Sequence, residues 1–293
     1  MLVGRTTVID AAIRLVTTTL GALGDNAAFP VAGDAYYNKA ASLRPLAKTL
    51  RTLTNGLPFS GDTATLLAGE DELLAQYIGH LGDWIALAGK EIDNQSRLVW
   101  GARTDLEHVL GRLQEQKEVV VGLLLAGQQA ESNTLQNSAA QSAGTTVVAV
   151  TSTVTKTSAA NAVVMTGYHE ELTALLAKLS VTSASAISPA LIPKKLTVDP
   201  EGLSAKAVAY ATCGADLLNV ARRYERVNVP GLVAATHGVL YTGEFNAALT
   251  VFDQGSTTVL QVLGRQVWQR FHNLSAAAKL FLSRDAAAAA SIR

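Results

Sequence analysis

The sequence contains few of the residues that interrupt helices or cross-link a chain. Seven prolines occur in 293 residues, and none lies between Pro58 and Pro189. Because proline breaks helix interiors and is confined to the edges of sheets, this interval permits helices of several turns lying side by side. Cys213 is the only cysteine, so no disulfide can form within the chain. We expect its thiol to be a small buried group rather than a nucleophile.

Charged and aromatic residues are also scarce. Charged residues make up 16% of the chain and aromatic residues 5%, whereas about 25% of the residues in a typical soluble domain are charged. A surface with so few charges is typical of a protein that contacts other protein, either further copies of itself or a partner. An alanine-rich helical enzyme domain has the same composition, so this alternative stays open.

Long apolar runs are missing as well. No stretch reaches about 18 consecutive apolar residues, the length that a membrane-spanning helix needs. The first 20 residues are amphipathic and include Arg5, Asp10 and Arg14, which is atypical of a secretory signal. We therefore expect no secretory signal and no transmembrane segment, and a location in a virion or in the cytoplasm.

The net charge is zero, but the charges are unevenly distributed. Residues 1–60 hold six basic and three acidic residues, and residues 61–132 hold five and twelve. Residues 133–199 hold four and three, and residues 200–293 hold nine and six. An acidic middle between basic ends can neutralise itself within one fold, or it can favour contacts between successive copies of the chain.

Apolar residues at spacings of three and four predict an all-α fold, a bundle of long helices. We expect a loop over residues 25–38 and a helix break near Gly89. The predicted helices cover residues 6–24, 39–55, 102–125, 145–179, 203–226, 230–242, 244–271 and 273–291, and a further helical pattern runs from Leu66 to Val99, interrupted by the break near Gly89.

Residues 145–157 fit two different structures. They are rich in Val and Thr, whose branched side chains favour strands. The spacing of three and four nevertheless continues through them from Val147 to Leu179, which favours a helix. An extended arm or a β-hairpin at 145–157 remains the alternative. Between Glu131 and Glu170 the only charged residue is Lys156, if His169 is neutral.

A segment with three prolines divides the chain. Pro189, Pro193 and Pro200 occur among serines and threonines, which predicts a connector or extended arm over 181–202. This division gives an N-terminal long-helix bundle over 1–180 and a C-terminal helical subdomain over 203–293.

No pattern in the sequence indicates a catalytic centre. The GxGxxG, GxxxxGK[ST] and GxSxG motifs are missing, and the five histidines lie far apart. We therefore expect no enzyme activity, no cofactor and no metal. An all-helical enzyme with an unrecognised site remains an alternative.

Basic residues at helical spacing are candidates for contact with nucleic acid. On a helix, Arg44, Lys48 and Arg51 would align along one side. Arginines match phosphate geometry, and an adjacent aromatic ring can stack on a base. The same residues can equally be ordinary surface charges that pair with the acidic middle of the chain. The complete candidate set is Arg44, Lys48, Arg51, Lys194, Lys195, Arg222, Arg223, Tyr224 and Arg226.

These observations favour a self-assembling structural protein, a coat or nucleocapsid subunit of the viral type. Its partners would be copies of itself, with nucleic acid bound through the arginine clusters. An α-helical pore-forming or membrane-remodelling protein is the alternative, because Val119–Leu125 and 143–165 are uncharged except for Lys156.

Overall fold

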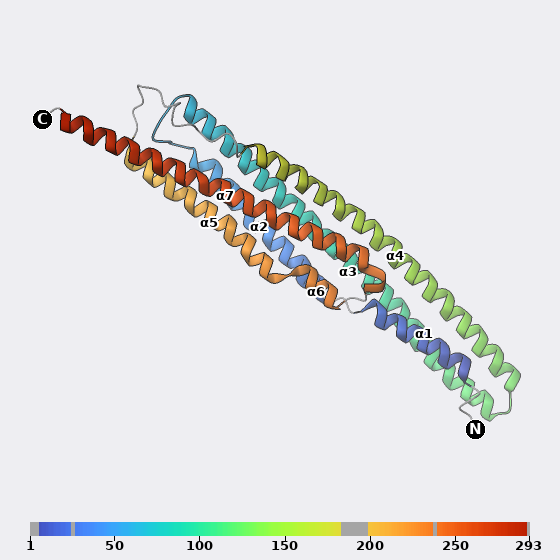
Figure 1. Ribbon diagram of the computed structural model, residues 1–293. Helices are drawn as coiled ribbons and strands as arrows, with labels where there is room; N and C mark the ends of the chain where they lie inside the picture. The colour runs from blue at the N-terminus through green and yellow to red at the C-terminus, as the bar shows by residue number, and fades with distance from the viewer. Residues whose placement is uncertain (1–5, 25–26, 183–198, 237–238, 292–293) are drawn as a thin grey trace. The chain divides into compact units, whose positions relative to one another are not determined.

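The computed structural model describes residues 6–24, 27–182, 199–236 and 239–291, and within them every regular element is an α-helix (Figure 1). This confirms the all-α, long-helix prediction. The helices are α1 (Thr7–Leu23), α2 (Ala28–Leu53), α3 (Asp62–Leu125), α4 (Gln129–Thr182), α5 (Pro200–Val227), α6 (Val229–Thr236) and α7 (Val239–Ser291).

Residues 145–157 are helical, so the alternative of an extended arm or β-hairpin there is wrong. They lie inside α4, where Val147 and Val154 point into the core. Thr146 and Thr151 donate their hydroxyl hydrogens to the carbonyl oxygens four residues earlier, at 3.0 and 2.8 Å. The periodic burial of apolar residues along the helix outweighs the strand preference of the individual side chains.

Several predicted helix boundaries are wrong. The expected loop at 25–38 is largely helical, because α2 already begins at Ala28 and accommodates Pro30 in its first turn. No break occurs at Gly89, and α3 is continuous over 64 residues. A Cβ atom at Gly89 would lie 3.3 Å from the Tyr36 Cβ, so this glycine permits close packing of α3 on α2. The two helices expected at 244–271 and 273–291 form the single helix α7.

The chain forms two compact units, each built from separate segments. Unit 1 comprises Met1–Gly33, Lys90–Thr166 and Val229–Thr250. Unit 2 comprises Asp34–Gly89, Gly167–Asn228 and Val251–Arg293. Whether 1–180 and 203–293 fold as separate domains stays a prediction. Most of the connector expected at 181–202 lies outside the described residues.

The core of unit 1 is an apolar seam between α1, α3 and α4. Its buried residues recur every seven positions on α1 and α3, a spacing that keeps one helix face against its neighbours. They include Ile9, Val16 and Leu23 on α1, Leu106, Leu113 and Val120 on α3, and Ala143, Val147 and Val154 on α4.

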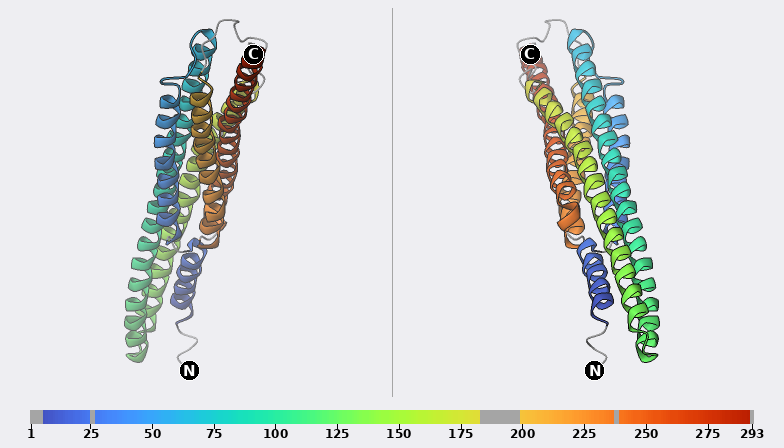
Figure 2. Two further views of the ribbon diagram at one scale, coloured as in Figure 1. Left: turned by 90° about the vertical axis from the view of Figure 1, so that its left-hand side faces the viewer. Right: turned by 90° about the vertical axis from the view of Figure 1, so that its right-hand side faces the viewer.

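A short turn joins α3 to α4 and reverses the direction of the chain (Figure 2). Gly127 has φ 78°, in the left-handed region that glycine adopts without strain. The amide of Gln128 donates to the Leu123 carbonyl at 2.9 Å, and the Gly127 amide donates to that of Leu124 at 3.2 Å. This pair of hydrogen bonds is a Schellman motif, which satisfies the free carbonyls at the end of α3.

In unit 2, α5 packs against α2 and α7. Lys206 Nζ on α5 donates to the carbonyl oxygens of Leu53 and Asn55, at 2.9 and 2.6 Å. A Cβ atom built on Gly214 of α5 would lie 2.9 Å from the Trp268 amide nitrogen and 3.0 Å from the Gly264 carbonyl oxygen of α7. Position 214 therefore requires glycine, because any side chain there would clash with the backbone of α7.

We predict that Gly214→Ala destabilises the protein by about 1–3 kcal/mol, because the added methyl group forces the α7 backbone to move. The control is Gly69→Ala on α3, where a Cβ atom meets nothing within 4 Å. This control should stabilise the helix by about 0.5–1 kcal/mol. Urea unfolding followed by circular dichroism measures both. Equal effects of the two substitutions would contradict the close approach.

Candidate functional site

The basic cluster on α2 lies on the surface of unit 2. Arg44, Lys48 and Arg51 are all exposed. Arg51 pairs with Glu72 of α3, with its Nε 3.0 Å from Oε2, whereas Arg44 and Lys48 form no hydrogen bond or ion pair with a described residue. Two of the three predicted cations are therefore free to contact a ligand.

The cluster on α5 is basic on the surface, but its aromatic residue is not accessible. Arg222, Arg223 and Arg226 are exposed, whereas Tyr224 is only 5% exposed. The Tyr224 ring packs inside unit 2, with the Lys39 Nζ 5.9 Å from its centroid, and Arg223 lies over it at 5.7 Å. Tyr224 is thus not available to stack on a base, and we remove it from the candidate interface. Lys194 and Lys195 lie outside the described residues.

A buried lysine, which sequence analysis missed, lies between α2 and α7. Lys39 is 1% exposed, and its Nζ donates to Ser256 Oγ at 2.8 Å and lies 3.6 Å from Asp253 Oδ1. The Tyr36 hydroxyl donates to the same Asp253 carboxylate at 3.1 Å. Burial lowers the pKa of Lys39, and the negative charge of Asp253 opposes this shift. Burial and Asp253 together raise the pKa of Tyr36 well above its usual value.

A second buried charge cluster joins α3, α5 and α7. Asp71 is fully buried and accepts a hydrogen bond from the Tyr210 hydroxyl. Arg270 Nε lies 2.7 Å from Asp71 Oδ1 as an ion pair without hydrogen-bond geometry, and Arg270 Nη1 lies 2.8 Å from Glu70. Burial raises the pKa of Asp71 to about 6, although the positive charge of Arg270 acts against this shift. Burial also raises the pKa of Tyr210, and the charge of Asp71 adds to this.

Within each of these two clusters, the buried charged side chains pair with other members of the same cluster, inside unit 2. Within the part of the chain that the structure describes, no three His, Cys, Asp or Glu side chains converge as metal ligands. Cys213 is buried, as predicted, and burial raises the pKa of its thiol to about 11. This thiol is therefore protonated at neutral pH and unsuited to nucleophilic chemistry.

The outer face of α4 in unit 1 is uncharged except at Lys156. Val148 and Val163 are 67% and 72% exposed, and the residues between them that reach solvent are otherwise mostly threonine and alanine. The part of α3 in the same unit has the usual charged outer face, with exposed Asp105, Glu107, Glu115 and Glu118. We call the outer face of α4 over residues 132–166 the uncharged strip.

Two further apolar features bear on membrane binding. At the end of α3, Val119 and Leu125 are 55% and 70% exposed. Thr7–Leu53 holds an 18-residue window of mean hydropathy 1.3, the one stretch among the described residues long and apolar enough for a membrane span. Buried core helices and secretion signals also reach this value, so the stretch is weak evidence for a membrane.

We predict that Asp71 makes unit 2 less stable as the pH rises through about 6. Its folded pKa lies above its unfolded value, so folding favours the protonated form and the resulting stabilisation is lost once Asp71 ionises. The stability of Asp71→Asn relative to wild type should therefore increase between pH 4.5 and 7.5, by at most about 3 kcal/mol.

Urea unfolding at several pH values measures this difference. Asp83→Asn, which removes an exposed carboxylate from the same helix, is the matched control. A stability difference between Asp71→Asn and wild type that stays constant over this pH range would contradict the assigned environment.

The chain matches no family model, no curated protein and no solved structure. The function therefore has to be inferred from the residues and their arrangement.

Proposed function

We propose that this protein is a structural subunit that assembles with copies of itself through the uncharged strip of α4, as coat and nucleocapsid subunits do. The supporting observation is the exposure of Val148 and Val163 on a helix face with a single charged residue. Water solvates such a face poorly, and covering it with protein releases apolar surface from water.

The composition of the strip suits a second copy of the same chain. In a two-fold symmetric contact, a residue near the axis meets its own copy, so a charge there would meet a like charge. The strip avoids this repulsion because Lys156 is its only charge. Small residues such as Ala149 and Ala160 are exposed there and would let two α4 helices approach closely.

The size of the strip indicates a weak contact. A helix of 35 residues is roughly 50 Å long and about 10 Å wide, so two facing strips bury on the order of 1,000 Å² in total. This is close to the lower limit of about 1,000–1,200 Å² for a specific interface. We therefore expect association that depends on protein concentration and strengthens when many subunits assemble.

Nucleic acid is a further partner in this proposal. Arg44, Lys48, Arg222 and Arg226 are exposed and have no ion-pair partner among the described residues. Unpaired cations on the neighbouring helices α2 and α5 can neutralise phosphates and release counterions, so binding would weaken as salt concentration rises. Because the net charge of the chain is zero, we expect a nucleic-acid strand to be held by a few local contacts with these cations rather than by a strongly basic surface.

We predict that Val163→Glu weakens self-association at least tenfold, because the new carboxylate would lose its water inside an apolar contact. Val208→Glu on α5, where the valine is 61% exposed, is the matched control and should associate like wild type. Sedimentation velocity over a concentration series, with and without single-stranded RNA, measures the association.

Circular dichroism should show both variants folded, since both valines are exposed. Wild type that sediments as a monomer throughout the series would contradict the proposal. Equal weakening by the two substitutions would contradict the assignment to α4.

A membrane-active protein is the second candidate, and the exposed apolar end of α3 favours it. Val119–Leu125 has no charged residue and ends at the turn into α4, so it could enter a lipid interface. Dye release from vesicles of neutral and of anionic lipid tests this candidate. Release by wild type but not by Leu125→Glu would support it, and the absence of both release and vesicle binding would remove it.

A further inference from the structure

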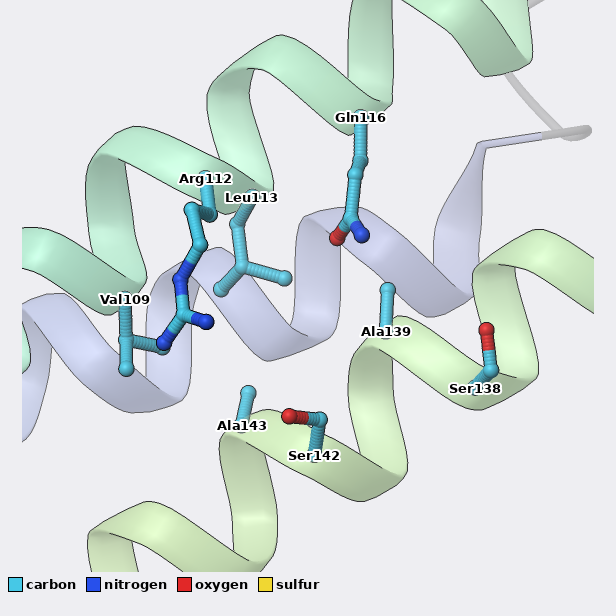
Figure 3. A pocket seen from close by; sticks show the side chains of 8 residues that line it. All are labelled: Val109, Arg112, Leu113, Gln116, Ser138, Ala139, Ser142 and Ala143. Carbon is cyan, nitrogen blue, oxygen red and sulfur yellow. The ribbon is translucent and has the colours of Figure 1, made fainter.

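A hollow of about 270 Å³ lies between α3 and α4 in unit 1 (Figure 3). Four apolar side chains form its walls: Val109 and Leu113 from α3, and Ala139 and Ala143 from α4. It is separate from the buried charge clusters, all of whose members belong to unit 2.

Two alanines of α4 form part of the floor of the hollow. Ala139 and Ala143 are 3% and 1% exposed, so they belong to the buried side of α4. One turn further along, the same side of the helix has Val147, and two turns beyond that it has Val154. Val109 and Leu113 on α3 are likewise only 5% and 2% exposed, so the hollow is an open groove above a closed apolar floor.

Three polar side chains line the hollow without a partner. The Arg112 guanidinium, the Gln116 amide and the Ser142 hydroxyl form no hydrogen bond or ion pair with any described residue. Figure 3 shows Arg112 and Gln116 reaching from α3 toward α4, with Ser142 on the opposite wall. All three groups can donate hydrogen bonds, and their donors are unmatched among the described residues.

The neighbouring helices supply no carboxylate for Arg112. On α4 no acidic residue occurs between Glu131 and Glu170. On α1, Asp10 already binds Lys117, with an Oδ1 to Nζ distance of 2.8 Å. An arginine that faces a helix without acids, above an apolar hollow, has the charge and geometry to hold an anion from outside the chain.

We propose that this hollow binds a small organic anion, with a carboxylate or phosphate head on a short apolar body. The planar guanidinium of Arg112 would hold two oxygens of the head, and Gln116 and Ser142 would donate further hydrogen bonds. The apolar body would lie on Ala139, Ala143 and Leu113. The volume is slightly below the typical ligand-site range of about 300–1,000 Å³, so one ring or a few carbons is the limit.

The proposal does not depend on self-association. The hollow is formed by two helices of one chain, and it can be tested with the Val163→Glu variant, which the assembly proposal expects to self-associate at least tenfold more weakly. Because the site is open and the ligand small, we expect a Kd on the order of 1 mM.

Ligand-observed NMR titration tests the site with three probes that share one phenyl ring: benzoate, phenyl phosphate and the neutral benzyl alcohol. Wild type should bind at least one of the anions saturably and should not bind benzyl alcohol. Arg112→Gln should weaken anion binding at least tenfold. Arg97→Gln, which removes another exposed arginine from α3, should leave it unchanged.

Gln116→Leu serves as a second variant that keeps the helix-forming character of α3 and removes one donor, and it should weaken anion binding severalfold. Three results would each overturn the proposal: no saturable binding of either anion to folded wild type, equal anion binding by Arg112→Gln and Arg97→Gln, or equal binding of benzyl alcohol and benzoate. None of these results bears on the self-association of the chain.

Discussion

The long helices of this protein are stable only because the apolar side of each one is covered along its length. Leu106, Leu113 and Val120 lie on one side of α3 and are buried against matching residues of α1 and α4. Most of the stability of a helix in a protein comes from such packing rather than from local preference. This requirement explains why Thr-rich and Val-rich residues of α4 are helical and why α3 continues through Gly89.

Polar side chains within the core fix the axial register of the packed helices, that is, which residues of neighbouring helices lie opposite each other. In unit 1, Gln95 donates to Ser158 Oγ at 3.3 Å and accepts from Asn161 at 3.1 Å. In unit 2, Lys39 and Asp71 have their acceptors and donors on α7 and α5. Sliding one helix past another by a turn would leave these buried groups unpaired, at a cost of several kcal/mol for a charged one.

The sequence predicted the fold class because the spacing of apolar residues is a local property. It wrongly predicted a helix break at Gly89, because the packing of this glycine against Tyr36 on a different helix is not visible in the local sequence. The buried charges could partly be detected in the sequence, because each lies on an apolar stripe. Lys39 lies between Tyr36 and Leu43, and Asp71 lies between Leu67 and Leu74. Their partners Asp253, Tyr210 and Arg270 are distant in sequence, so only the tertiary structure could identify them. The burial of Tyr224 was likewise not predictable from its arginine neighbours.

The scarcity of charge noted in the sequence is most marked over residues 132–169, which include the uncharged strip of α4. The assembly proposal depends on that strip being covered by a second copy. Sedimentation equilibrium of the wild-type chain tests this most directly. We predict an average mass that rises above the monomer value of 30.7 kDa as the protein concentration increases from the micromolar range. A mass that stays at the monomer value up to the highest soluble concentration would contradict the account.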